Sequence, residues 1–423
     1  MNESEQITVA NGVRLTSVFA ERFKRDVLAV YLAVPLKKET AAENALLARV
    51  LTHGSERFPD LYRMNRELDR LYGARLSSHV SKLGETQILT FTLTAIKGRF
   101  TFDGKDIGME CVRFLLDVLL HPAFENGTFA ESVVESERRS LIDDINGLIN
   151  DKNAYAGVRM TEEMCRGEAY GIRETGTAQD VKAVTKEALT AAWKRVVSEA
   201  RIEIITVGEA DRTAAAEAAA QAFSGMERAP YTPSSTDLAA APATVRRVTE
   251  EMNVEQGKLA IGLRTGLASP RDTLPLVYAN CIFGSGVSSK LFLIVREQMH
   301  LCYYCYSRPE VFKGLLTVQS GVDVANAAKA EQAILEQLEA VKRGDFTQKD
   351  MDAARVALRN AYLSTEDDPA QIASWFYKEL FRGENRSPKE VADRLDTYTK
   401  DDLVRAFAGV TPDTVYFLRG AEK

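Results

Sequence analysis

The sequence is poor in the residues that bind transition metals and that cross-link secreted proteins. Its 423 residues include four histidines and five cysteines. No two of the histidines lie four residues apart, so no helix carries the pair of imidazoles that a zinc-peptidase helix uses. Five cysteines in a chain of this length do not make a disulfide framework, so a reducing, cytoplasmic setting is expected.

Long apolar runs and an excess of positive charge are also missing. No stretch of 18 apolar residues exists, so no membrane span is expected. The first six residues, Met-Asn-Glu-Ser-Glu-Gln, have no basic segment leading into an apolar stretch, which argues against a secretion signal. The net charge of -6 disfavours nucleic acid as a partner. The length exceeds a single ordinary core and predicts two domains.

An internal repeat accounts for this length. The tripeptide Arg-Gly-Glu at 166–168 recurs at 382–384. After each copy comes a similar phrase, Thr-Lys-Glu from Thr185 and Thr-Lys-Asp from Thr399. Each phrase then runs into a strand-like segment that ends near a glycine. A repeat of this length indicates two copies of a domain rather than a solenoid.

The segment between the two copies has the composition of a linker, because it is rich in Pro, Ala, Ser and Thr and has no apolar periodicity. We therefore predict an N-terminal domain at 1–225, a linker at 226–245 and a homologous C-terminal domain at 246–423. Each half mixes strands joined by short connections with long helices. This pattern predicts an α+β fold of two duplicated domains, each a mostly antiparallel sheet covered by helices.

Residues 45–55, Ala-Leu-Leu-Ala-Arg-Val-Leu-Thr-His-Gly-Ser, carry apolar side chains at helical spacing and stop at a glycine. The segment resembles the zinc-bearing helix of the insulinase/pitrilysin/mitochondrial-processing-peptidase family, where His-x-x-Glu-His precedes Gly-Thr or Gly-Ser. On that register the two histidines fall on Ala45 and Arg49, and the general-base glutamate falls on Ala48. A methyl group has no lone pair and a guanidinium is always protonated. The resemblance thus implies the clamshell-like fold of a zinc metallopeptidase with no metal in this chain.

The family's third zinc ligand is a glutamate on a later helix. The resemblance implies that Glu137 and Asp144 lie in the corresponding helix of this chain. The two acids lie two turns apart, so they can face one side together. Arg49 would place a fixed positive charge where zinc would have been. We hypothesise that Arg49 pairs with Glu137 or Asp144 and so joins the two helices without metal. The alternative is that Arg49 points to solvent and that both acids are ordinary surface residues.

The segment 288–307 resembles the family's C-terminal motif, in which a helix ends in Arg-Glu and the arginine precedes a tyrosine by seven residues. Here these residues are Arg296 and Tyr303. The resemblance implies that the pair binds the substrate backbone near the scissile bond, and both side chains can donate to a carbonyl that becomes an oxyanion. The structural alternative is a helix C-terminal cation and a strand aromatic.

The nearby Cys302 and Cys305 have Cys-x-x-Cys spacing, which is found in zinc and redox sites. This segment is predicted to be a strand, in which residues three apart point to opposite faces. We therefore expect the two thiols not to converge.

In some bacterial members of this family, one chain brings His-x-x-Glu-His and another brings the Arg/Tyr pair. The sequence resembles the second kind. The function this implies is that of a non-catalytic, substrate-positioning subunit in a heterodimer with a metal-bearing paralogue that acts on peptides. A narrower resemblance is to the zinc-less homologue associated with 5-aminopentanol modification of elongation factor P. The alternatives are a scaffold or peptide-binding protein of the same fold, and a self-sufficient peptidase with unusual ligands.

Overall fold

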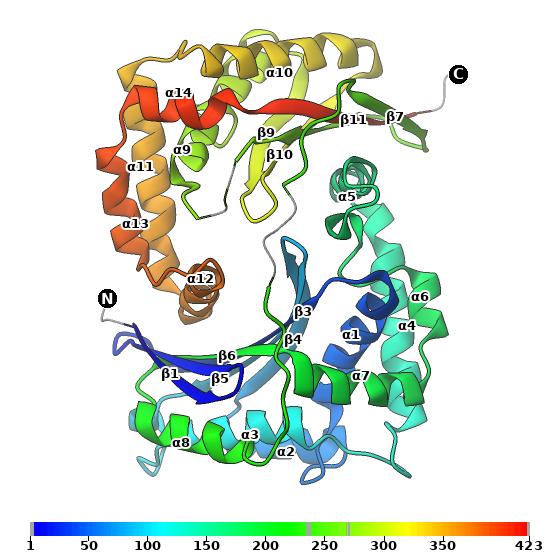
Figure 1. Ribbon diagram of the computed structural model, residues 1–423, viewed down its shortest axis with the longest axis vertical. Coiled ribbons are helices and arrows are strands. Elements are labelled where there is room, and N and C mark those ends of the chain that lie inside the picture. The colour runs from blue at the N-terminus through cyan, green and yellow to red at the C-terminus, as the bar shows by residue number, and fades with distance from the viewer. Residues whose placement is uncertain (1–3, 234–237, 268, 270, 421–423) are drawn as a thin grey trace. The chain divides into compact units, whose positions relative to one another are not determined.

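A computed structural model describes residues 4–233, 238–267, 269 and 271–420. The chain divides into two compact units, which we call unit 1 and unit 2 (Figure 1). Unit 1 consists of Met1–Asn146, Ile172–Ser235 and Thr365–Asn385, and unit 2 consists of Gly147–Gly171, Thr236–Ser364 and Arg386–Lys423. Each unit thus takes one segment from the opposite half of the sequence. The boundaries at 225 and 246 stay a prediction, and residues 234–237 of that linker lie outside the described residues.

Unit 1 is built on a six-stranded sheet with the order β1-β2-β6-β3-β5-β4. Only the β2–β6 pair is parallel, and the other four pairs are antiparallel. The strands are β1 (Ser4–Ala10), β2 (Val13–Phe19), β3 (Arg25–Pro35), β4 (Arg75–Leu83), β5 (Thr86–Ile96) and β6 (Arg201–Gly208). The helices are α1 (Lys38–Val50), α2 (Leu61–Arg70), α3 (Gly108–Leu120), α4 (Glu131–Gly147), α6 (Ala178–Ala183), α7 (Lys186–Glu199), α8 (Arg212–Ala222) and α12 (Pro369–Phe381).

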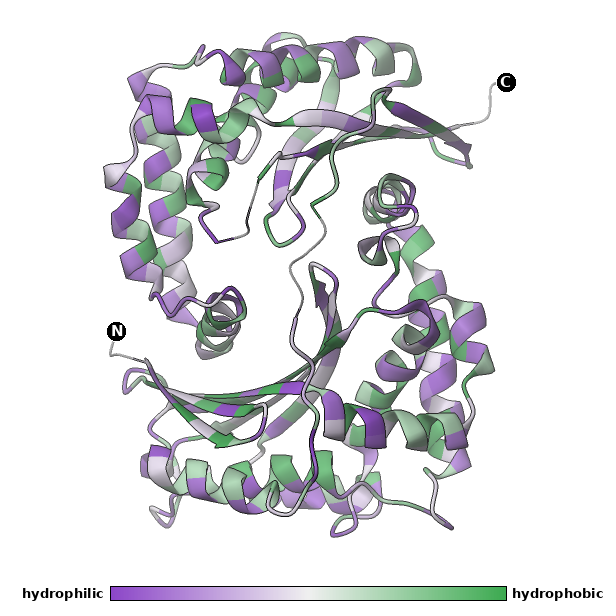
Figure 2. Cartoon of the chain, viewed as in Figure 1, coloured by the Kyte–Doolittle hydropathy of each residue, from purple (hydrophilic) through white to green (hydrophobic). Residues whose placement is uncertain are grey.

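The central strand β3 is largely apolar and buried from Val27 to Val34, because both faces of this part are covered. Leu28, Val30 and Leu32 belong to the main core with the residues of α1 and α3. Ala29 and Tyr31 point the other way into a second cluster formed with α12. Successive side chains of a strand point to opposite faces, so a strand buried on both sides needs a continuous apolar run. Figure 2 shows this run as an apolar stretch through the sheet.

Unit 2 repeats the arrangement with five strands in the order β7-β11-β8-β10-β9. Again one pair, β7–β11, is parallel and the others are antiparallel. The strands are β7 (Arg246–Glu251), β8 (Gly257–Arg264), β9 (Cys302–Glu310), β10 (Leu315–Val322) and β11 (Thr411–Arg419). The helices are α5 (Lys152–Met164), α9 (Leu274–Phe283), a π-helix (Leu291–Gln298), α10 (Ala327–Lys342), α11 (Gln348–Ser364), α13 (Pro388–Arg394) and α14 (Lys400–Ala408). The predicted α+β fold of two duplicated, mostly antiparallel domains is confirmed.

The repeated tripeptide marks the end of a helix in each unit. Gly167 follows α5 and Gly383 follows α12, and their φ angles are 89° and 81°. A glycine in this left-handed conformation is the common residue just past a helix end, because it has no Cβ to clash. The repeated threonines likewise have one role. Thr185 caps α7 and Thr399 caps α14, each accepting a backbone N–H at the first turn. The sequence repeat therefore corresponds to helix boundaries that the two halves of the chain share.

The two helices that end in this tripeptide belong to the unit opposite their own half of the sequence. Helix α12 packs on β3 and β6 of unit 1, where the rings of Tyr31 and Tyr377 stack with centroids 4.0 Å apart. Helix α5 packs on β8 and β11 of unit 2 through Met160 and Met164. A Cβ on Gly262 would lie 2.4 Å from the Met164 sulfur, so this contact depends on a glycine in β8.

Polar contacts also fix the segment after α5 in unit 2. The carboxylate of Glu168 accepts from Arg264 at 2.6 Å and lies 2.8 Å from the buried Lys313 ammonium. Asp413 accepts from the other edge of Arg264 at 2.9 Å. Buried charges are tolerated when they are paired and hydrogen-bonded, so the glutamate of the first Arg-Gly-Glu has a structural role.

Candidate functional site

The zinc-motif register falls on α1, and its two alanines lie in the core of unit 1. Ala45 is 2% exposed and Ala48 is 1% exposed, and both pack with Leu46 and Leu47. Buried methyl groups contribute packing and no lone pair. Two of the three positions that would carry the family motif therefore have neither the chemistry nor the exposure of a ligand.

Arg49 closes the last turn of α1 and faces α4. Its Nη2 is hydrogen-bonded to Asp144, its Nη1 donates to the Ser140 hydroxyl at 3.1 Å, and Nη1 lies 3.9 Å from Glu137 Oε2. The guanidinium thus contacts both acids named by the sequence register, and Asp144 is the nearer partner. An arginine bonded to residues of a neighbouring helix joins the two helices through charge-assisted hydrogen bonds.

His53 is the member of this cluster that the sequence reasoning missed. Its Nε2 lies 2.9 Å from Glu137 Oε1, so Glu137 is shared between His53 and Arg49. The signal was present in the spacing. Residues 49 and 53 are four apart, and α1 continues into a short 3-10 turn, Leu51–His53. This spacing places both side chains on one face.

These side chains do not fit a zinc ion. An arginine occupies the position between the two acids, and a guanidinium cannot donate a lone pair to a cation. Across the described parts of the chain, no three His, Cys, Asp or Glu side chains are grouped so that they could hold a metal. We therefore derive no catalytic step through zinc in this chain.

Arg296 lies in unit 2 on the π-helix that precedes β9. The wider turn of this helix is recorded by the Met299 N–H, which donates to the Ile294 carbonyl, five residues earlier, at 2.9 Å. The Arg296 side chain is 39% exposed, stands 4.6 Å from the Phe292 ring centroid and lies 3.4 Å from a carboxylate oxygen of Glu297. Segments of π-helix occur often at functional sites, because the extra residue re-aims the side chains of the turn. Within the described residues, this guanidinium has no other recorded polar contact, so most of its donors remain available.

Tyr303 is the extra residue of a β-bulge at the start of β9. In the pairing with β10, Cys302 is opposite Val322 and Tyr304 is opposite Gly321, so Tyr303 has no partner. A bulge turns its side chain away from the regular alternation. Tyr303 is 59% exposed, and its hydroxyl makes one long hydrogen bond, 3.3 Å, to Asp323. Among the described residues, no hydrogen bond joins Arg296 to Tyr303.

The bulge also overturns the expectation that Cys302 and Cys305 diverge. Cys302 is opposite Val322 and Cys305 is opposite Ser320, so the two cysteines are spaced like residues two apart on β10. Residues two apart share a face. The two thiols also shift each other's pKa, which fits this placement. The error came from assuming regular alternation, and Gly321 on the partner strand explains the departure. A Cβ on Gly321 would lie 2.5 Å from the Tyr304 ring.

Comparison with known proteins gives the family. The probable inactive metalloprotease YmfF of Bacillus subtilis is 31% identical over 412 residues, 97% of this chain and 96% of that protein. Residues 183–358 match the family model described as the peptidase M16 inactive domain. The chain belongs to the peptidase M16 family. An uncharacterized zinc protease of Mycobacterium leprae is 25% identical over 69% of this chain and 66% of that protein.

Solved structures confirm the M16-type fold. A conserved protein from Enterococcus faecalis has a TM-score of 0.91 at 22% identity and covers 100% of both chains. A peptidase M16 inactive domain from Pseudomonas fluorescens has a TM-score of 0.80 at 16% identity, over 99% of this chain and 98% of that one. The sequence resemblance is therefore confirmed, and this M16 chain is a non-catalytic homologue without His-x-x-Glu-His.

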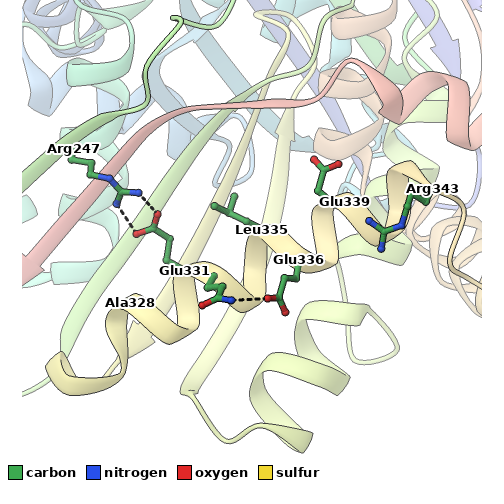
Figure 3. Close-up of a pocket in the computed structure, with 8 residues that line it drawn as sticks. Arg247, Ala328, Glu331, Leu335, Glu336, Glu339 and Arg343 are labelled. Atoms are coloured by element: carbon green, nitrogen blue, oxygen red, sulfur yellow. Dashed lines mark hydrogen bonds and ion pairs between the residues drawn. The ribbon is translucent and has the colours of Figure 1, made fainter.

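A groove in unit 2 is lined by residues that do not include Arg296 or Tyr303. It has a volume of about 760 Å³ and follows one face of α10 (Figure 3). Arg247 and Glu331 form a two-pronged ion pair at 2.6 and 2.8 Å, and Gln332 donates to Glu336 at 2.9 Å. These groups satisfy one another, so the groove offers no convergent polar set for a ligand.

None of the helices in the described part of the chain has the length and apolar character to cross a bilayer.

Proposed function

We propose that this M16 chain is the non-catalytic, substrate-positioning subunit of a heterodimeric zinc metallopeptidase that acts on peptides in the cytoplasm. A paralogous chain carrying His-x-x-Glu-His would supply the zinc and the hydrolysis. The observation that carries the proposal is the exposure of Arg296 and Tyr303. Among the described residues, Arg296 leaves most of its donors unused and the Tyr303 hydroxyl donates one long hydrogen bond, to Asp323, while the predicted zinc positions hold two alanines and an arginine.

The chemistry of the pair suits a peptide carbonyl. A guanidinium and a phenol donate hydrogen bonds without needing deprotonation, and both strengthen their bonds when the carbonyl oxygen gains negative charge. The surroundings suit an extended peptide. Several large apolar side chains next to the pair in the sequence are exposed, namely Val287, Leu293, Met299 and Tyr306. An exposed apolar set beside fixed donors is typical of a surface that binds another chain.

Reconstitution with the paralogue tests the proposal. The paralogue alone, this chain alone and the mixture are assayed for peptide cleavage after co-purification shows that the two chains assemble. We expect cleavage only from the mixture, and loss of cleavage without loss of assembly when Arg296 is replaced by Ala. A paralogue that cleaves equally well by itself contradicts a positioning role.

The second candidate is a scaffold or peptide-binding protein with no peptidase role. The observation that favours it is the similarity of the fold to a chain of complex III2 from Candida albicans, with a TM-score of 0.74 at 14% identity over 98% of this chain and 95% of that one. A stable assembly whose cleavage rate does not respond to Arg296 or Tyr303 would support the scaffold. The narrower resemblance to homologues associated with elongation factor P modification stays a prediction.

A further inference from the structure

The start of β9 holds two thiols in an arrangement that a regular strand does not provide. The bulge at Tyr303 leaves Cys302 and Cys305 opposite Val322 and Ser320, which are two residues apart on β10. Two steps along a strand separate Cα atoms by roughly 6.6 Å. Disulfides bridge Cα separations of up to about 6.8 Å, so the pair lies at the long end of the range that can be cross-linked.

The two thiols differ in exposure, as the two members of a reactive dithiol commonly do. Cys302 is partly exposed and Cys305 is 4% exposed. The hydrogen bond from Cys305, with smaller contributions from the Ser320 hydroxyl and the positive charge of Arg296, lowers the pKa of Cys302 to about 7. The same hydrogen bond and burial raise the pKa of Cys305. Cys302 is therefore the nucleophile of the pair, and Cys305 is the protonated partner.

The other cysteines do not share these properties. Cys111, Cys165 and Cys281 are all buried, and burial raises the pKa of Cys111 to about 12 and that of Cys281 to about 11. Reaction with a peroxide requires an accessible thiolate. The chain thus contains one candidate dithiol and three internal reference thiols.

We propose that Cys302 and Cys305 form a reversible, peroxide-sensitive dithiol at the bulge of β9. The Cys302 thiolate attacks one oxygen of hydrogen peroxide, so an S–O bond forms, the O–O bond breaks and hydroxide leaves. The Cys305 sulfur then attacks the Cys302 sulfenic acid, so the S–S bond forms and the S–O bond breaks. The hydroxyl leaves with the Cys305 proton as water. In total, two thiols and one peroxide give one disulfide and two waters, and a dithiol reductant reverses the change.

The disulfide would close a small ring that contains Tyr303. The backbone of Tyr303 would then lie inside this ring. The bulge that orients the Tyr303 side chain would be altered. The consequence for peptide cleavage rests on the proposed function, whereas the oxidation itself does not. The two can therefore fail separately.

The first experiment treats the reduced full-length chain with hydrogen peroxide and maps the tryptic peptide 297–313 by mass spectrometry. We expect an intramolecular disulfide in this peptide, reversed by dithiothreitol, while Cys111, Cys165 and Cys281 stay reduced. Cys305→Ser should stop at a sulfenic acid on residue 302 that dimedone traps, and Cys302→Ser should show neither product. At neutral pH, iodoacetamide should alkylate Cys302 at least ~10-fold faster than Cys281. Circular dichroism confirms that each variant folds.

Oxidation spread over all five cysteines, a disulfide between two molecules, or no sulfenic acid in Cys305→Ser would overturn the proposal. The second experiment oxidises the complex with the metal-bearing paralogue. We expect cleavage to fall on oxidation and to recover on reduction, and a Cys302→Ser, Cys305→Ser double variant to cleave peptide without responding to peroxide. If the disulfide forms in peptide 297–313 but cleavage is unchanged, the coupling to Tyr303 is wrong. If the mixture never cleaves, the proposed function fails and the redox site is judged by the first experiment alone.

Discussion

The two units each carry an arginine at a position predicted from the family's site, and the surroundings of the two arginines differ. In unit 1, Arg49 is bonded to Asp144 and Ser140 and lies near Glu137, which also contacts His53. In unit 2, Arg296 stands over Phe292 with one weak contact to a neighbouring glutamate. The charges around Arg49 are paired with one another, whereas the charge of Arg296 is left exposed.

This difference separates structural from functional use of the same residue type. A side chain whose donors are already filled contributes to stability and has little left to offer a ligand. A side chain with open donors on an exposed surface contributes little to stability and can bind. The comparison therefore predicts that changes in the unit 1 cluster alter unfolding, and that changes at the unit 2 pair alter peptide cleavage by the complex.

The largest expected effect is on cleavage by Arg296→Ala. Removing a donor to a developing oxyanion costs about 100-fold in rate, so we expect kcat/KM of the reconstituted complex to fall by about that factor with unchanged assembly and thermal stability. Arg308→Ala is the matched control, because Arg308 is an exposed arginine on β9. Equal losses from the two variants would show that general charge, not the position of Arg296, is what matters.

A smaller effect is expected from Tyr303→Phe, which removes only the hydroxyl. One hydrogen bond to a group that becomes charged is worth about 1.5 kcal/mol, which is about 10-fold in rate. The exposed ring and the bulge are kept, so unfolding should not change. Tyr62→Phe, at an exposed tyrosine of unit 1, serves as the reference. A loss in KM alone for Tyr303→Phe would assign the hydroxyl to ground-state binding instead.

Unit 1 variants should show the reverse pattern, with an effect on stability and none on cleavage. Glu137→Gln weakens the contacts to His53 and Arg49, and we expect the free energy of unfolding to fall by about 1 kcal/mol. The Arg49–Asp144 pair should contribute about 0.5 kcal/mol in a double-mutant cycle, since the Asp144 side chain is 64% exposed and water screens the pair. Denaturant unfolding measures both. A loss of cleavage in Arg49→Ala with normal assembly would break the comparison between the units.

Adding zinc to the isolated chain is expected to have no effect on its melting temperature. A ligand that binds only the folded state raises the melting temperature, and the Arg49 cluster offers no metal site. The melting temperature of the isolated chain should be the same with added zinc and with a chelator. The paralogue provides the positive control. Stabilisation of this chain by stoichiometric zinc would revive the alternative of a self-sufficient peptidase.

The sequence by itself determined which zinc ligands are missing and where several helices and strands lie. Alanine at 45 and 48 and arginine at 49 cannot coordinate zinc in any conformation, because this follows from residue type alone. The repeated Arg-Gly-Glu and threonine phrases located matching helix ends, because caps and left-handed glycines are local requirements. The apolar run 27–34 likewise favours a strand that is buried on both faces, because successive side chains of a strand point to opposite sides.

Only the tertiary structure decided the contacts that depend on a distant partner. The choice of Asp144 as the nearer partner of Arg49, and the sharing of Glu137 with His53, depend on how α1 and α4 pack. The exchange of α5 and α12 between the units depends on which sheet face each helix covers. The bulge that aims Tyr303 and brings Cys302 to Cys305 depends on the register with β10 and on Gly321. Register is a property of two strands together, so one strand's sequence does not contain it.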